Sequence, residues 1–185
     1  MMTRLTALDP DKTSGKTKEL FNAIHAKFGV VPNMMRTMGN SPAFLEGYLN
    51  LSGALSGGSL GVKTGALIAL TVAEANSCNY CLSAHTYLGA NLAKLDAEAL
   101  EAARLGKGKD AKTTAILQFA QTLVAKKGKV NDTDVAAVKA VGVTEGEIAE
   151  IVGHVALNIL TNYFNNTSNT QIDFQVVEAR EVAVV

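Results

Sequence analysis

Apolar positions recur at helical spacing along most of this chain, and the alternating pattern of β-strands is scarce. An apolar stripe predicts a first helix over residues 16–28, which Gly29 ends. Ser41 followed by Pro42 is a typical helix start, and residues 56–59 break that second helix. The pattern therefore predicts an all-α fold.

Residues 60–75 are apolar almost all round, which is typical of a central, buried helix. The sequence leaves two possibilities for the segment after residue 75. Either Ser77 caps a new helix that begins at Cys78, or the first helix continues through Asn76 with a kink. The direction in which Glu74 points depends on this choice.

The second half of the chain has clear helix starts. Asp96, Asp110 and Asn131 are each placed to cap a helix, and Thr144 opens a capping-box pattern. The helix after Thr144 is the longest and is expected to end near residue 165. Its predicted core stripe is Ile148, Ile151, Val152, Val155, Ile159 and Tyr163.

The composition fits one domain with a sizeable core over residues 1–185. Hydrophobic residues make up 48%, charged residues 18%, and the formal net charge is zero, which gives no indication of nucleic acid or an anionic membrane as a partner. The longest apolar run is too short to span a bilayer, and the N-terminal segment lacks the apolar stretch of a secretory signal, so we expect a cytoplasmic protein. The domain core is expected at about 16–166. The extended C-terminal tail, 167–185, is expected to be a tail or an arm onto a neighbouring subunit.

The candidate chemistry is concentrated in one short segment, which holds both cysteines, a histidine and an acid. On a helix, Glu74, Cys78, Cys81 and His85 fall within about 60° of one another. In a reducing compartment, a Cys-x-x-Cys pair is more often catalytic or metal-binding than stabilising. The set matches the needs of thiol redox chemistry: a nucleophile, a second thiol and a base.

The spacing suggests a role for each residue. Cys81 and His85 are neighbours at i, i+4, so the imidazole can take the thiol proton and favour the thiolate. We therefore assign Cys81 as the attacking thiolate and Cys78 as the resolving thiol, which condenses with the sulfenic acid to a disulfide. Glu74 is a candidate to orient or protonate His85, or to exchange a proton with Cys78.

The stretch from Leu67 to His85 resembles the signature of the carboxymuconolactone decarboxylase superfamily, in particular its alkylhydroperoxidase D-like branch. The segments Val31-Pro-Asn-Met, Ser41-Pro-Ala-Phe and Thr161-Asn-Tyr-Phe-Asn are similar to the peroxidase-related members. The resemblance thus covers most of residues 20–175.

This resemblance implies a compact, multi-helix domain that assembles into homo-oligomers, often trimers or hexamers. It also implies alkylhydroperoxidase activity through Cys78 and Cys81, with a proton relay of Glu, Cys and His. An external dithiol is required as reductant, and no organic or metal cofactor is expected. Some relatives carry the relay glutamate twelve residues before the first cysteine, where this chain has Ala66, whereas Glu74 matches another variant of the branch.

Several alternatives stay open. The first is a carboxymuconolactone decarboxylase-like lyase that uses His85 and Glu74 as acid and base. The second is a redox-sensing oligomer without enzymatic activity, in which the Cys78–Cys81 bond changes assembly. The two cysteines can also be small buried apolar residues. A closed zinc site is disfavoured because no second Cys or His pair is present further along the chain.

Other residues have two interpretations each. Tyr80 either hydrogen-bonds in the relay or packs, and His25 is expected at the surface. Three methionines either line an apolar pocket or fill core gaps: Met34, Met35 and Met38. A polar row on the longest helix supports the active site, lies at an interface or is solvated: His154, Asn158 and Asn162.

Overall fold

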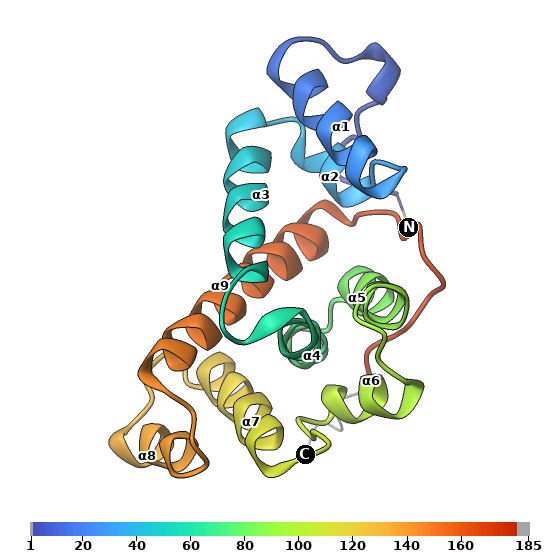
Figure 1. Ribbon diagram of the computed structural model, residues 1–185. Helices are drawn as coiled ribbons and strands as arrows, with labels where there is room; N and C mark the ends of the chain where they lie inside the picture. The colour runs from blue at the N-terminus through green and yellow to red at the C-terminus, as the bar shows by residue number, and fades with distance from the viewer. Residues whose placement is uncertain (1, 181–185) are drawn as a thin grey trace.

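The computed structural model describes residues 2–180, and within them the chain is all-helical, as predicted (Figure 1). A short 3-10 helix, Pro10–Lys12, precedes nine α-helices in this described part. These are α1 (Gly15–Phe28), α2 (Asn33–Met38), α3 (Pro42–Ser56), α4 (Gly61–Ala75), α5 (Asn79–Asn91), α6 (Ala97–Arg104), α7 (Ala111–Ala125), α8 (Asp132–Ala140) and α9 (Glu145–Ser168). None of the helices in residues 2–180 is both long and apolar enough to cross a membrane.

Helix α4 is the centre of the fold. It packs against α5, α6, α7 and α9, and Figure 1 shows it enclosed by these elements. A helix surrounded in this way must be apolar on every side, which explains its sequence. Its buried residues are Gly65, Leu67, Ile68, Ala69, Leu70, Thr71, Val72 and Ala73.

The predicted helix starts are confirmed, because each capping side chain accepts the expected backbone hydrogen bond. Ser41 Oγ accepts from Phe44 N, and the Asp96 carboxylate accepts from Ala99 N. Full capping boxes open α8 at Asn131 and α9 at Thr144. Local hydrogen bonds at the helix ends therefore set most of the element boundaries.

The junction between α4 and α5 differs from both predicted alternatives. Helix α4 ends at Ala75, so it does not continue through Asn76 with a kink. Ser77 adopts a left-handed conformation with φ of 49°, and Cys78, not Ser77, is the N-cap of α5. The Cys81 backbone N–H donates to Cys78 Sγ at 3.3 Å, so the sulfur takes the place of a capping oxygen.

The core face of α9 also differs from the predicted stripe. Val152 and Tyr163 are 45% and 60% exposed, whereas the row His154, Asn158 and Asn162 is buried. The reason is that α9 packs against α3, α4, α5 and α7 together, so its inner face is wider than one apolar stripe. The polar row therefore faces the protein interior.

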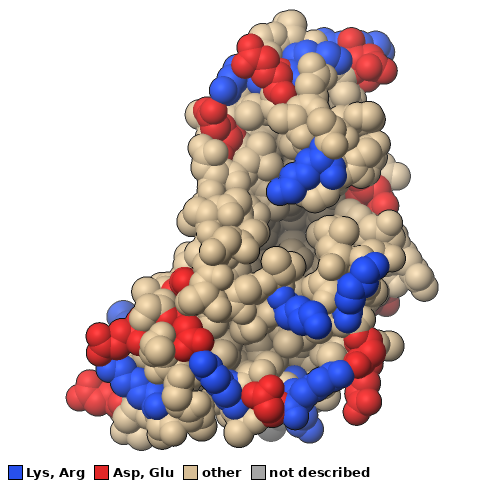
Figure 2. Space-filling model, viewed as in Figure 1, with Lys and Arg blue, Asp and Glu red and all other residues tan. Residues whose placement is uncertain are grey.

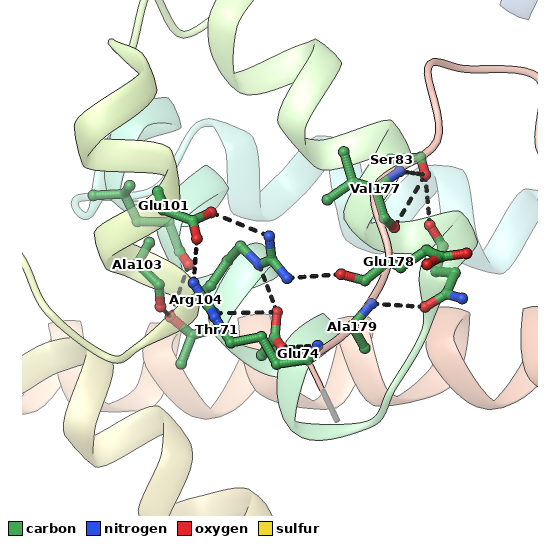
Figure 3. Close-up of polar contacts among 12 residues, drawn as sticks. Thr71, Glu74, Ser83, Glu101, Ala103, Arg104, Val177, Glu178 and Ala179 are labelled. Carbon is green, nitrogen blue, oxygen red and sulfur yellow. Dashed lines mark hydrogen bonds and ion pairs between the residues drawn. The ribbon is translucent and has the colours of Figure 1, made fainter. Parts of the chain in front are cut away.

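The chain after α9 is extended and runs along α5 of the same molecule. Val177 N donates to Ser83 Oγ at 2.9 Å, and Ala179 N donates to Asn79 Oδ1 at 2.9 Å (Figure 3). Helix α9 ends at Ser168, three residues beyond its expected end near residue 165 and two beyond the expected core boundary at 166. The remainder of the predicted tail, residues 181–185, lies outside the described residues, so its proposed contact with a neighbouring subunit stays a prediction.

Thr71 joins α4 to α6 and provides a test of this packing. Its Oγ1 is fully buried and donates to Ala103 O at 2.7 Å (Figure 3). We expect Thr71→Val to lower the free energy of unfolding by about 1–2 kcal/mol, since a buried hydrogen bond is lost while the shape is kept. Urea denaturation measures this change.

Thr122→Val is the matched control. Thr122 Oγ1 donates to Gln118 O within its own helix, close to the surface, and we expect a loss below about 0.5 kcal/mol. Equal losses in the two variants would contradict a special role for the contact between α4 and α6.

Candidate active site

A cavity of about 230 Å³ lies between α2, α3, α4, α5 and α9. Figure 2 shows a hollow on this face of the molecule, beside the lower half of α3, with mostly uncharged walls. Val62 and Leu92 line the cavity and are exposed, so it communicates with the surface. None of the described residues that line it is a lysine, arginine, aspartate or glutamate. The cavity is therefore suited to an uncharged, largely apolar molecule.

The two cysteines lie at the start of α5. They form a disulfide with their Cα atoms 5.3 Å apart. Both are buried, with exposed fractions of 0% for Cys78 and 2% for Cys81, but Cys81 lines the cavity and Cys78 does not. Of the two sulfur positions, that of Cys81 is thus the one available to a molecule in the cavity.

His85 comes one helical turn after Cys81 and lines the same cavity. Burial lowers the pKa of His85 to about 4, and a side-chain hydrogen bond with Asn158 acts in the opposite direction. The imidazole is consequently neutral at pH 7. One of its nitrogens is able to accept a proton, as a base beside a thiol must.

Asn165 of α9 is a site residue that the sequence analysis missed. Its Nδ2 donates to Cys81 Sγ at 3.3 Å, and the side chain is buried. The polar row could have indicated this residue, because Asn165 lies three residues after Asn162 and seven after Asn158 and so shares their helix face. A donor in this position stabilises negative charge on the sulfur of a reduced Cys81.

The rest of the row supports the site from within the same chain. Asn162 Oδ1 accepts from Asn76 Nδ2 at 2.9 Å, and Asn166 Nδ2 donates to Asn76 O at 3.0 Å. These contacts tie α9 to the turn that carries Cys78. The row was expected to support the active site, to lie at an interface or to be solvated. The contacts described here fit the first of these alternatives.

The sequence of this region matches the Carboxymuconolactone decarboxylase family over residues 42–121, which include both cysteines and His85. The matched segment of the chain is thus similar to this family. No curated protein matches it in sequence. Among solved structures, a peroxidase-related protein from Ralstonia eutropha JMP134, described as an alkylhydroperoxidase AhpD core, is 21% identical with a TM-score of 0.83. That alignment covers 94% of this chain and 93% of the other.

Two further solved structures have a fold similar to that of this chain. A peroxidase-related protein from Silicibacter sp. TM1040 is 22% identical with a TM-score of 0.79, over 92% of this chain and 95% of the other. The debrominase Bmp8, a cysteine-to-alanine variant in complex with 2,3,4-tribromopyrrole, is 18% identical with a TM-score of 0.77, over 94% and 93%. At these identities the likeness establishes the alkylhydroperoxidase D-like fold.

Glu74, the relay candidate suggested by the superfamily resemblance, has its described contacts elsewhere. Its Oε2 accepts from Arg104 Nε at 2.5 Å, and its Oε1 accepts from Arg180 N at 2.7 Å (Figure 3). It does not line the cavity with Cys81 and His85. In this structure Glu74 holds α6 and the C-terminal segment to α4, and its role in a relay stays a prediction.

The position of the alternative relay glutamate in the superfamily is also informative. That position is Ala66 here, and Ala66 lines the cavity. A methyl group thus stands on the cavity wall where a carboxylate would introduce charge. Asn158, which also lines the cavity, is the neighbouring side chain that raises the pKa of His85 against the effect of burial.

Tyr80, between the cysteines, lines the cavity and has a structural contact. Its hydroxyl accepts from Met34 N at 3.0 Å, and its ring meets Phe174 edge-on at 5.8 Å. Burial and the Asp173 carboxylate raise the pKa of Tyr80, so it stays protonated. Met34 also lines the cavity, whereas Met38 is 1% exposed in the core, so the methionines serve both predicted purposes.

A metal centre has no obvious ligands in this part of the superfamily fold. Within residues 2–180, no three side chains among His, Cys, Asp and Glu gather closely enough to hold an ion. The cysteines and His85 are the ligand types that zinc prefers, but they are one donor short of a closed tetrahedral site.

The partly buried, neutral His85 predicts a specific acid sensitivity. An unfolded histidine binds a proton near pH 6.5, but the folded His85 does so only near pH 4, so acid favours the unfolded chain between these values. Stability is expected to be full above pH 6.5 and to fall by up to about 3 kcal/mol as the pH drops to about 4.

Urea denaturation at a series of pH values tests this expectation. In His85→Phe, the free energy of unfolding should no longer show this decrease between pH 6.5 and about 4. His25→Phe, at an exposed position, should have the same pH dependence as the unmodified protein. If His85→Phe has the same pH dependence of stability as the unmodified protein, another group is responsible.

Asn165 predicts a change in thiol reactivity. In the reduced protein, Asn165→Ala removes a donor to the Cys81 sulfur, and we expect alkylation of Cys81 by iodoacetamide at pH 7 to slow about tenfold. Mass spectrometry of the Cys81 peptide gives the rate. Asn22→Ala, at an exposed position on α1, is the control and should react like the unmodified protein. Identical rates for both variants would remove Asn165 from the site.

Proposed function

We propose that this protein is a thiol-dependent peroxidase that reduces alkyl or other organic hydroperoxides. The observation that carries the proposal is the position of Cys81. Its sulfur lies at the wall of an apolar cavity, one turn from a neutral imidazole and bonded to a second cysteine. Few other chemistries use all three of these features together.

In the proposed reaction, His85 accepts the thiol proton of reduced Cys81. The Cys81 thiolate attacks the terminal oxygen of the hydroperoxide, so an S–O bond forms as the O–O bond breaks. The sulfur is oxidised by two electrons to a sulfenic acid, and the alkoxide that leaves takes the proton from His85. The product is an alcohol.

Cys78 completes the cycle. Its thiol sulfur attacks the sulfenic acid of Cys81, forms the disulfide and releases water. The short Cα–Cα distance of 5.3 Å allows this bond without rearrangement of the helix. An external dithiol then reduces the disulfide and is itself oxidised, so the reaction consumes one dithiol for each hydroperoxide and needs no further cofactor.

The surroundings of the sulfur support the assignment of Cys81 as nucleophile. Asn165 Nδ2 donates to the Cys81 sulfur from α9 and so favours a negative charge there. The exclusion of charged side chains from the cavity favours an uncharged organic substrate over an ionic one.

Reductive dehalogenation is a second candidate, favoured by the same apolar cavity next to a redox-active thiol pair. The debrominase Bmp8 shares the fold, and reduction of a carbon–bromine bond by two thiols would leave the same Cys78–Cys81 disulfide. The two candidates differ in the oxidising substrate. Bromide release distinguishes them directly.

Thiol titration with mass spectrometry tests the proposal. We expect the reduced protein to lose two thiols per chain on addition of cumene hydroperoxide and to gain one bond within the peptide that contains Cys78 and Cys81. Cys78→Ser should lose one thiol and yield a sulfenic acid at Cys81, and Cys81→Ser should consume no peroxide. His85→Gln should slow the reaction by about 100-fold or more, as is typical for loss of a general base.

The outcomes separate the candidate functions. Unchanged thiols with hydroperoxide, but loss of thiols and release of bromide with 2,3,4-tribromopyrrole, would favour dehalogenation. Activity on a carboxymuconolactone that survives replacement of both cysteines would favour a lyase. A change of oligomer size between the oxidised and reduced forms, without peroxide consumption, would favour a redox sensor. The same sizing experiment tests the proposed cytoplasmic homo-oligomer for its trimeric or hexameric state.

A further inference from the structure

His154 is a buried histidine in the cavity that the proposed reaction does not use. It lies on α9, lines the cavity and is 7% exposed. Its Nε2 is buried without a hydrogen-bond partner among the described residues. Buried polar atoms in native proteins are nearly always paired, so an unpaired one at a cavity wall indicates a site for a ligand atom.

The imidazole of His154 is held in place. The neighbouring wall of α4 has Gly65, where an added Cβ would lie 2.8 Å from His154 Cε1. The His154 carbonyl accepts from Asn158 Nδ2 at 2.8 Å, which fixes the turn of α9 on its other side. The ring therefore fills a space that a side chain at position 65 would otherwise occupy.

The position of His154 relative to the sulfur is set by α9. Asn165 contacts Cys81, Asn158 and His85 line the same cavity, and His154 comes one turn before Asn158 on the helix. At about 1.5 Å per residue, His154 lies about 6 Å along the axis beyond Asn158 and about 16 Å beyond Asn165. The cavity thus has a reacting end and, further along the same wall, one unpaired polar atom.

The ligand that fits this arrangement is uncharged. The cavity has no charged lining residue in the described chain, and burial lowers the pKa of His154, so the ring is neutral at pH 7. A carboxylate placed here would be desolvated without a cation to pair with. A neutral imidazole nitrogen binds a hydroxyl or another neutral hydrogen-bonding group equally well as donor or acceptor, according to its tautomer.

We propose that His154 Nε2 binds a neutral polar group at the far end of the substrate, so that the preferred hydroperoxide has an apolar body with a hydroxyl-like group remote from the peroxide. This inference rests on the proposed peroxidase function. His154 acts here as a specificity residue, since it contacts the substrate away from the bond that breaks.

A length scan of substrates tests the proposal. Single-turnover oxidation of the reduced protein is measured with ω-hydroxyalkyl hydroperoxides and with n-alkyl hydroperoxides of the same length, from about four to ten carbons, a range that spans the separation along α9. We expect the hydroxyl to raise the second-order rate constant about tenfold at one chain length, as one well-placed hydrogen bond does. The ratio between the paired substrates should fall to about one at every length in His154→Leu.

Three variants control for an unspecific effect. His154→Gln keeps a hydrogen-bonding group and should retain part of the ratio. Gly65→Ala keeps His154 in the sequence, but the new methyl group displaces its imidazole. This variant should therefore reduce the ratio between the rate constants of the paired substrates. His25→Leu, at an exposed position on α1, should keep the full ratio. A full ratio in His154→Leu, or no hydroxyl advantage at any length in the unmodified protein, would overturn the proposal.

A binding measurement separates this inference from the peroxidase proposal. The oxidised protein cannot attack a peroxide, so 1-alkanols and α,ω-diols of equal length serve as unreactive probes. We expect diols to bind about tenfold more tightly than alkanols and to shift the His154 imidazole resonances in NMR spectra. This preference would stand even if the thiols prove inert to hydroperoxides. Equal affinities in the unmodified protein, or the same diol preference in His154→Leu, would refute the His154 site even if the peroxidase is active.

Discussion

The arrangement of the site depends on the tight turn between α4 and α5. Helix α4 is buried on all sides, so its direction is fixed by the core, and the left-handed Ser77 reverses the chain immediately after it. Cys78 then caps α5 with its own sulfur, which places Cys81 one turn later on the cavity wall. A residue inserted in this turn would rotate α5 by about 100° and carry both Cys81 and His85 away from the cavity. Asn76, held from α9 by Asn162 and Asn166, makes the turn rigid.

The buried polar face of α9 is the second constraint, and it is a consequence of the first. A helix that lines a reactive cavity must place amides and an imidazole where a stable core would have aliphatic side chains. Most of these groups are satisfied by partners in the site: Asn162 by Asn76, and Asn165 by the Cys81 sulfur. Three buried atoms of this face have no described partner: Asn162 Nδ2, Asn165 Oδ1 and His154 Nε2. Of these three residues only His154 lines the cavity, and it is therefore the one whose unpaired atom is closest to a bound ligand.

Local interactions explain which features could be predicted from the sequence. The caps at Ser41, Asp96 and Thr144 act within three residues, so the helix starts were predictable, and the apolar periodicity of α4 gave its central position. The Cys-x-x-Cys-x-x-x-His spacing led to the superfamily for the same reason. The inner face of α9 was not predictable, because periodicity identifies an apolar stripe and the burial of Asn165 depends on a sulfur 84 residues away. The contacts of Glu74 with Arg104 and Arg180 could not be predicted for the same reason, because these residues are 30 and 106 positions away in the sequence.

The absence of charge in the described cavity wall connects the chemistry to the choice of substrate. In an apolar cavity the neutral imidazole is the stable form of His85, so it can accept a proton but holds it weakly. The same low polarity makes the thiolate costly to form, and the Asn165 amide offsets part of that cost at the sulfur itself. In the proposed reaction, the imidazole takes the Cys81 proton and an ion pair forms inside the protein. A peroxide that accepts this proton on its leaving oxygen would remove both charges together. A site of this kind favours neutral substrates whose reduction returns the cavity to neutrality, which is a property of hydroperoxides and their alcohol products.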